Sequence, residues 1–425
     1  MDLDRIKRLT KEIGWVIFGQ IVAVVGTLAL VRVLTERLSP DIYGLLALGL
    51  TLAGLANQVI MGGITVAVAR YYPIAVESQS LAAYFQATKR LLVIASLVIL
   101  ASGFFLVAGL WVGGSRHWVG LAALITVFSL LTSYGGACGA ILNAARRRAL
   151  VAVYGGLDAC LKVVLTIALL YWLGISAEAV VSAYIFSALI IIVAQYRSLR
   201  LLFEGEKKAP GDGESHWRRQ MKEYSWPFIS WGIFTWAQQI SDRWALELYG
   251  STEAVGFYVV LFQLGYAPIV LVVGMAVSFL SPIFFQRAGD ATDHQRRSEV
   301  RALAWRIVMA TLALTLLAFT LTFILHEWLF SFLVSSEYRS ISYLMPWMVA
   351  AGGVFAMGQM LALRLMSDMR AKAMTKAKIC TALFGGGLNL LGAAQAGIEG
   401  VVASLLFASV VYTAWMLFLA IDIRH

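Results

Sequence analysis

About a dozen apolar stretches, each roughly 20 residues long, fill nearly the whole 425-residue chain and are separated by short polar segments. The stretches are continuous and do not alternate with period two, so they predict membrane-spanning helices and not barrel strands. The predicted fold class is therefore all-α, a polytopic membrane protein with about 12 transmembrane helices. The predicted spans lie at 14–34, 44–64, 91–112, 119–141, 151–173, 179–196, 228–248, 255–276, 307–325, 344–363, 379–396 and 401–421.

The beginning of the chain is repeated halfway along it. Placing KEIGW of the first half over KEYSW of the second sets an offset of 211 residues, at which Arg32 falls on Arg243 and Glu36 on Glu247. Six spans per half is an even number, so both halves enter the membrane in the same direction, as parallel repeats do. Such a duplication is typical of transporters whose substrate path lies between two lobes.

A connection between the lobes is predicted at 199–224, because the Gly, Pro and charge content of KKAPGDGES cannot pack a core. The predicted organisation is a six-helix lobe at 1–198, a cytoplasmic linker at 199–224 and a second six-helix lobe at 225–425. Pro268 lies within the eighth span and is expected to kink it.

Composition and charge agree with this organisation. The chain is 60% hydrophobic, 14% charged and has a mean hydropathy of +0.78, more apolar surface than a soluble domain can bury. Of its 34 lysines and arginines, 28 lie in segments on the side of the N-terminus and four on the other side. This bias predicts that both termini are cytoplasmic, and it explains the net charge of +10 without a nucleic-acid partner. The three cysteines and five histidines show no metal-ligand spacing.

Several spans contain polar or ionisable side chains, which cost free energy there and normally face a bundle interior or water. The fifth span carries Asp158 and Lys162, four residues apart on one helix face, either as a self-neutralising pair or as part of a cavity. The seventh span carries Gln238, Gln239 and Asp242 at spacings that indicate a polar stripe. A cavity lining is the favoured interpretation of that stripe, because lipid would reject it.

Arg32 and Arg243 end the first helix of each half. In one interpretation each arginine snorkels to the outer interface and pairs with the glutamate four residues further on. In the other, the duplication places two guanidinium groups at similar depth in opposite lobes, where they can grip phosphate oxygens bidentately.

Short motifs in four places are similar to those of one family. They are Pro-acid-x-aromatic-Gly in the first hairpin, an Asp in the seventh span with Gly and Tyr after the turn, an acid–aromatic pair before the tenth span and a Gly-rich entry to the twelfth. Here they read Pro40, Asp41, Tyr43 and Gly44; Asp242, Gly256 and Tyr258; Glu337 and Tyr338; and GIEGVVAS. With them, the chain resembles the Wzx-type polysaccharide (O-antigen) flippases, the polysaccharide transporter branch of the multidrug/oligosaccharidyl-lipid/polysaccharide exporter superfamily.

The resemblance implies a MATE-like fold of two lobes with alternating access. It implies that the cargo is an undecaprenyl-diphosphate-linked oligosaccharide, flipped across the bacterial cytoplasmic (inner) membrane for surface polysaccharide such as the O-antigen of lipopolysaccharide. No cofactor is expected, and H+ and Na+ stay open as coupling ions. The suggested partners are the lipid bilayer, a polysaccharide polymerase and glycosyltransferases. The substrate-binding candidates are Arg32, Arg243, Asp242, Gln238, Gln239, Asp158 and Lys162.

Two other functions stay open. A cation-coupled multidrug or small-molecule exporter of the same fold would need an acidic cavity, whereas the charged groups here include Lys162, Arg32 and Arg243. A membrane enzyme such as a glycan polymerase would place catalytic groups on a sizeable outer loop, but the longest outer connection, 326–343, is short and largely apolar. The sequence contains no Gly-rich nucleotide-binding loop, so the expected function is transport and not catalysis.

Overall fold

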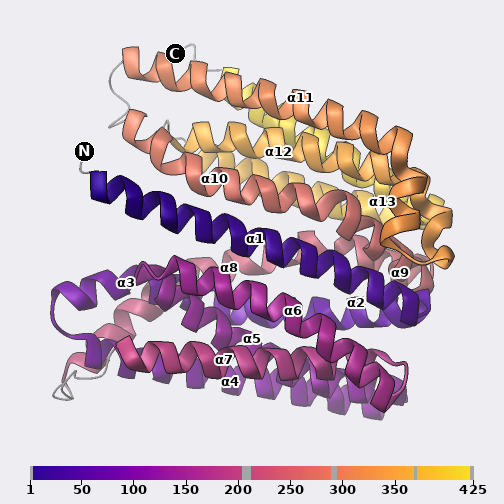
Figure 1. Ribbon diagram of the computed structural model, residues 1–425, viewed down its shortest axis with the longest axis horizontal. Coiled ribbons are helices and arrows are strands. Elements are labelled where there is room, and N and C mark those ends of the chain that lie inside the picture. Colours follow the sequence, from indigo (N-terminus) through magenta and orange to yellow (C-terminus); the bar gives the residue numbers. More distant parts are fainter. Residues whose placement is uncertain (1–2, 203–211, 289–293, 368–370, 422–425) are drawn as a thin grey trace. The chain divides into compact units, whose positions relative to one another are not determined.

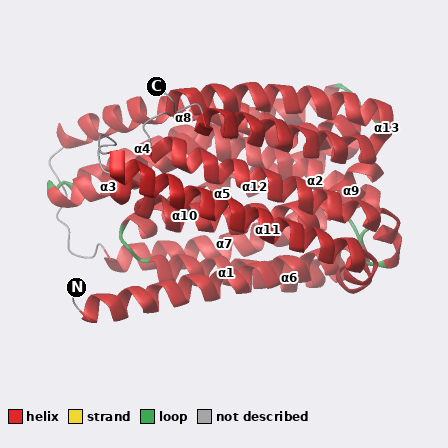
Figure 2. Cartoon of the chain, turned by 90° about the horizontal axis from the view of Figure 1, so that it is seen from above, coloured by secondary structure: helices red, strands yellow, loops and turns green. Residues whose placement is uncertain are grey.

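The computed structural model describes residues 3–202, 212–288, 294–367 and 371–421, and these are helical apart from short turns (Figure 2). The all-α prediction is confirmed. The elements are α1 (Leu3–Arg37), α2 (Pro40–Leu55), η1 (Ala56–Met61), α3 (Gly62–Glu77), α4 (Leu81–Val112), η2 (Arg116–Trp118), α5 (Val119–Ala144), α6 (Arg148–Leu173), α7 (Ala177–Leu202), α8 (Asp212–Tyr249), α9 (Thr252–Leu261), η3 (Phe262–Tyr266), α10 (Ala267–Ala288), α11 (His294–Leu333), η4 (Ser336–Leu344), α12 (Met345–Ser367) and α13 (Ala371–Ile421).

Among the described residues, ten helices are long and apolar enough to cross a membrane. Two further features bring this number close to the predicted twelve. The predicted span 228–248 lies in α8, whose polar and charged side chains keep it outside the ten. The last two predicted spans are joined in α13, which leaves helical geometry at Ala396 and Gly397. Gly397 has φ +56° and ψ −130°, a conformation that glycine adopts without the steric cost of a Cβ.

The chain forms two compact units, and each unit consists of two separate segments of the sequence. Unit 1 comprises Met1–Leu38 and Leu45–Trp236, and unit 2 comprises Ser39–Gly44 and Ala237–His425. Two helices are therefore shared. The first turn of α2 belongs to unit 2 while the rest belongs to unit 1, and α8 passes from unit 1 to unit 2 after Trp236.

The first turns of α8 lie within the predicted linker and pack into the core of unit 1. Trp217 is 6% exposed, and its ring centroid lies 5.9 Å from that of Tyr71 and 6.2 Å from that of Tyr84. Residues 212–224 are thus helical, because aromatic burial outweighs the Gly and charge content that suggested a flexible connection. Residues 203–211 of the linker lie outside the described part of the chain, and the domain limits drawn from the sequence stay a prediction.

Within unit 1, α1 packs along α6 through small residues (Figure 1). A Cβ added at Gly19 would lie 2.6 Å from the Cβ of Ala152, and one added at Gly26 would lie 2.8 Å from the Cβ of Ala159. Membrane helices associate mainly through such close backbone packing, because lipid supplies no hydrophobic driving force between them. The spacing of seven between the two glycines therefore sets the face of α1 that contacts α6.

A π-helix interrupts the second span of each half. In the second half it is η3, which ends directly before Ala267 and Pro268. Proline lacks an N–H and its ring clashes with the carbonyl four residues earlier, so a wider turn at this point relieves the clash. The backbone N–H of Ala267 accordingly donates to the carbonyl of Phe262, five residues earlier. The perturbation expected at Pro268 takes the form of a widened turn.

Within unit 2, α12 packs against α10, α11 and α13, and the span Ser336–Met366 is the most buried of the ten, with 72% of its apolar window inside the protein. The two parts of α13 fold back on each other across Gly397. A Cβ at Gly392 or at Gly400 would collide with the other's carbonyl group, so the two backbones touch. Ser404 Oγ also donates to the carbonyl of Leu388 at 2.8 Å and fastens this hairpin.

Candidate functional site

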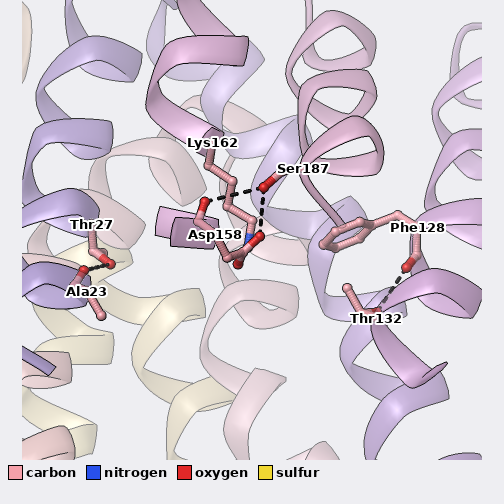
Figure 3. A network of polar contacts seen from close by, with 7 residues as sticks. All are labelled: Ala23, Thr27, Phe128, Thr132, Asp158, Lys162 and Ser187. Carbon is pink, nitrogen blue, oxygen red and sulfur yellow. Dashed lines mark hydrogen bonds and ion pairs between the residues drawn. The ribbon is translucent and has the colours of Figure 1, made fainter. Parts of the chain in front are cut away.

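Unit 1 holds an ion pair within the membrane span of α6. Lys162 Nζ lies 2.6 Å from Asp158 Oδ2, and Ser187 Oγ of α7 donates to Asp158 Oδ1 at 2.7 Å. Figure 3 shows the lysine and the serine turned toward the same carboxylate. Lys162 also lies 5.5 Å from the ring centroid of Tyr184, close enough for a cation–π contact. The cluster is neutral, and both carboxylate oxygens have a partner, so it can remain within a span at modest cost.

The C-terminal end of α1 carries the first of the two duplicated pairs. Arg32 Nη2 lies 2.5 Å from Glu36 Oε1, and the two side chains are 35% and 45% exposed. This is the contact that the interfacial interpretation expects, one turn apart on a partly exposed helix face. The functional role of Arg32 stays a prediction.

Unit 2 holds a buried carboxylate in α8. Asp242 is 4% exposed, and its Oδ1 accepts a 2.7 Å hydrogen bond from the backbone N–H of Arg243. Its Oδ2 accepts a 2.6 Å hydrogen bond from the hydroxyl of Tyr258, a fully buried side chain of α9. Asp242 therefore ties α8 to α9, and donors in unit 2 occupy both of its oxygens.

Arg243 differs from Arg32 although the two occupy equivalent positions in the repeat. The guanidinium carbon of Arg243 lies 5.0 Å from the ring centroid of Phe262, and its Nε is buried without a hydrogen-bond partner among the described residues. Glu247, four residues further on, accepts a 3.0 Å hydrogen bond from Thr252 Oγ1. Within the described part of unit 2 no ion pair joins Arg243 to Glu247, so this guanidinium has an aromatic partner and no carboxylate partner.

The polar stripe of α8 divides in the structure. Gln238 and Gln239 are exposed, whereas Asp242 is buried against α9. Ser241, which lies between them, accepts a 2.9 Å hydrogen bond from Asn389 Nδ2 of α13. The two glutamines are thus exposed on the surface of α8, while Asp242 and Ser241 connect helices of unit 2.

The structure brings Asp158 together with Lys162 in an ion pair. It also places Asp242 next to Arg243, but their side chains have different partners: Asp242 accepts a hydrogen bond from Tyr258, and Arg243 lies over the ring of Phe262. Arg32 belongs to unit 1 and Arg243 to unit 2. In the described residues no group of three or more His, Cys, Asp or Glu side chains is arranged to hold a metal ion.

Sequence reasoning missed three polar residues that hold the site's helices. Ser187 completes the Asp158 cluster, and Asn389 is 5% exposed beside Ser241. Asn57 lies in η1, where its Nδ2 donates to Thr132 Oγ1 at 2.9 Å and attaches the π-helix to α5. The two asparagines were detectable as lone amides within apolar spans, because an amide in hydrocarbon requires a partner.

A comparison of the sequence with models of known protein families identifies the family of this chain. The sequence model described as "Polysaccharide biosynthesis protein" matches residues 9–287, more than half of the chain. The chain belongs to the polysaccharide biosynthesis protein family. A search of curated proteins gave no match.

Several solved structures share the fold of this family member at low sequence identity. A lipid II flippase MurJ in an inward closed conformation superposes with a TM-score of 0.69 at 11% identity, covering 96% of this chain and 87% of that one. A MATE in the straight conformation gives 0.63 at 12% identity, covering 96% and 93%. An inward-facing multidrug resistance MATE family transporter of the MOP superfamily gives 0.61 at 14% identity, covering 94% and 93%. The predicted MATE-like polytopic fold is thereby confirmed.

Proposed function

We propose that this chain is a flippase that moves an undecaprenyl-diphosphate-linked oligosaccharide from the cytoplasmic to the outer leaflet of a bacterial cytoplasmic membrane. Its membership in the polysaccharide biosynthesis family supports a glycan cargo. The observation that carries the proposal is Arg243, a cation within a predicted span that stacks on Phe262 and pairs with no carboxylate in the described chain.

Arg243 suits a diphosphate for two physical reasons. The guanidinium carbon lies over an aromatic ring, 5.0 Å from its centroid, and a ring does not use up the N–H donors, which can make a planar, bidentate contact with phosphate oxygens. A buried donor without an acceptor costs about 1–3 kcal/mol, and an anionic ligand that accepts from Nε recovers this cost. Arg32 and Lys162 already contact carboxylates, so they contribute less uncompensated charge.

The remaining candidate residues suit the rest of the head group. A diphosphate cannot cross about 30 Å of hydrocarbon unaided and needs a hydrated path with cationic groups. The exposed amides of Gln238 and Gln239 can hydrogen-bond sugar hydroxyls without selecting strongly among them. In the proposed cycle the head group passes between the lobes at 1–198 and 225–425 by alternating access, while the lipid tail stays in the bilayer. The 28-to-4 distribution of basic residues supports cytoplasmic N- and C-termini.

The test uses a bacterial strain that lacks its own flippase and is complemented with variants of this chain. Arg243→Lys should restore part of the surface polysaccharide, because the charge is kept but the bidentate fork is lost. Arg243→Ala and Arg243→Glu should abolish it at normal protein abundance, measured by immunoblot. Arg219→Ala is the matched control, because Arg219 is 82% exposed and pairs with Glu223 on the surface of α8. Full restoration by Arg243→Glu would show that this arginine does not bind the diphosphate.

The alternative is a cation-coupled multidrug or small-molecule exporter of the same fold, and Asp242 is the observation that favours it. This carboxylate is 4% exposed within a predicted span, where a coupling cation or an organic cation could bind. Its two oxygens already accept hydrogen bonds from Tyr258 and from the backbone of Arg243, which weakens that case. An exporter would raise resistance to cationic drugs and would leave the complemented strain without surface polysaccharide.

A further inference from the structure

The repeated Arg-x-x-x-Glu pair is formed in one half of the chain and separated in the other. In unit 1, Arg32 Nη2 lies 2.5 Å from Glu36 Oε1. In unit 2, Arg243 Nε and Glu247 Oε2 are both buried without a hydrogen-bond partner among the described residues. Arg243 and Glu247 are four residues apart on one face of α8, so a change of side-chain rotamers is enough to bring them together.

Two contacts within unit 2 hold the members of the second pair apart. The guanidinium carbon of Arg243 lies 5.0 Å from the ring centroid of Phe262. The carboxylate of Glu247 accepts a 3.0 Å hydrogen bond from Thr252 Oγ1 across the turn between α8 and α9. Each charged group therefore has one uncharged partner and keeps one buried polar atom without a partner.

The first half of the chain lacks both of these contacts. With SPDIYG of the first half placed over STEAVG of the second, the offset is 212 residues, because the preceding turn is one residue longer in the second half. At that offset Thr252 falls on Pro40 and Phe262 falls on Leu50. Proline has no hydroxyl and leucine has no aromatic ring, so the pair in unit 1 has neither alternative partner. The two halves therefore show the same pair with and without the groups that separate it.

We propose that Glu247 releases the anionic head group of the cargo by competing with it for Arg243. In the separated arrangement, the N–H donors of Arg243 can bind phosphate oxygens. When Glu247 turns toward Arg243, its carboxylate takes the place of those oxygens, as Glu36 occupies Arg32 in unit 1. This inference rests on the proposed function, because it concerns the same arginine. Glu247 acts through Arg243 and is a positioning residue.

The first experiment measures the affinity of the purified full-length protein in detergent for undecaprenyl diphosphate, a probe that carries the phosphate groups without a sugar. Glu247→Gln keeps the size of the side chain and removes the competing charge. It should bind the probe about fivefold more tightly, because Arg243 is then free of its competitor. Glu253→Gln is the matched control and should leave the affinity unchanged, since Glu253 is an exposed carboxylate in the first turn of α9.

Transport should change in the opposite direction. In the complemented strain, Glu247→Gln should lower surface polysaccharide about fivefold at normal protein abundance, because a cargo that is bound more tightly dissociates more slowly. A purely structural role of Glu247 would instead lower affinity and transport together. The opposite signs of the two effects therefore distinguish competition from a folding defect.

A second variant changes the competition without touching either charged residue. Thr252→Val removes the hydroxyl that holds Glu247 away from Arg243, so it should weaken binding of the probe about twofold or more. The start of α9 is preserved, because its N-cap is Ser251. Thr252→Val should have no effect on affinity in the Glu247→Gln background, and Glu247→Gln should have none in the Arg243→Ala background.

Equal or weaker binding by Glu247→Gln would overturn the competition, and so would an increase in affinity that persists without Arg243. Binding of the probe that depends on Arg243 but not on Glu247 would overturn only this inference and leave the proposed function standing. A wild-type protein that does not bind undecaprenyl diphosphate would contradict the proposed function itself, and the role of Glu247 with it.

Discussion

The hydroxyl of Tyr258 donates a 2.6 Å hydrogen bond to Asp242 Oδ2, and both side chains are almost fully buried in unit 2. This bond connects a charged group of α8 to α9 across the turn between two spans. Tyr258→Phe should destabilise the protein by about 1.5–3 kcal/mol, because a buried carboxylate then loses a donor. Thermal unfolding of the purified protein in detergent measures the effect. Tyr249→Phe is the control, since Tyr249 is 54% exposed, and an equal loss in both variants would contradict this role of Tyr258.

The ion pair between Asp158 and Lys162 predicts non-additive substitutions. Each single change to alanine leaves one charge within a span without its partner, which costs more than removing both. The coupling free energy in a double-mutant cycle should be about 0.5–3 kcal/mol, measured from unfolding in detergent. Simple additivity would show that the two groups do not stabilise each other.

The same cluster predicts a smaller effect at Ser187. Ser187→Ala removes one hydrogen bond to Asp158 but leaves the ion pair with Lys162, so it should cost about 0.5–1.5 kcal/mol. The comparison with the Lys162→Ala variant is made in the same unfolding assay. A larger loss for Ser187→Ala than for Lys162→Ala would mean that the serine, and not the lysine, holds the carboxylate.

Arg32 and Arg243 should respond differently to the same changes. Arg32 pairs with Glu36 on a partly exposed face, so Arg32→Ala should reduce surface polysaccharide less than Arg243→Ala does. Replacement of either by lysine should keep part of the activity. The measurement is surface polysaccharide in the complemented strain, normalised to protein abundance. Full activity of the glutamate variants at both positions would show that neither arginine binds the diphosphate, and both would then be interpreted as interfacial side chains.

Topology gives an independent prediction. With cytoplasmic termini, a cysteine at His216 should resist an impermeant thiol reagent in intact cells, and a cysteine at Glu253 should react with it. Both positions are exposed on helix surfaces, so accessibility of the side chain itself is matched. Labelling at His216 with protection at Glu253 would reverse the proposed orientation.

The turn between the last two spans depends on one glycine. Gly397 has a positive φ, so Gly397→Ala should destabilise the hairpin of α13 by about 1 kcal/mol or more. Gly387→Ala is the control, because Gly387 is helical and a Cβ there meets nothing within 4 Å. Equal thermal stability of the two variants would show that the backbone at Gly397 is not constrained.

The order of apolar and polar segments by itself determined the class of the protein. A chain that is 60% hydrophobic must use the bilayer as solvent, and a span there must satisfy its own backbone hydrogen bonds, so length and continuity of the runs suffice to predict helices. Local spacing also placed Asp158 and Lys162 together, because residues four apart share a helix face. The lone amide of Asn57 was visible as well, but its partners Thr132 and Ser133 lie on another helix, about 75 residues away in the sequence.

Tertiary structure determined the surroundings of the repeated residues, which the repeat in the sequence does not predict. Equal sequence at Arg32 and Arg243 predicts equal surroundings, yet one side chain pairs with Glu36 and the other stacks on Phe262, because packing partners come from other helices. The composition of the segment 212–224 predicts a linker, but the segment is helical because Trp217 packs against the rings of Tyr71 and Tyr84 in unit 1. Sequence spacing describes neighbours within one helix, whereas burial and the choice of partner depend on which helices meet.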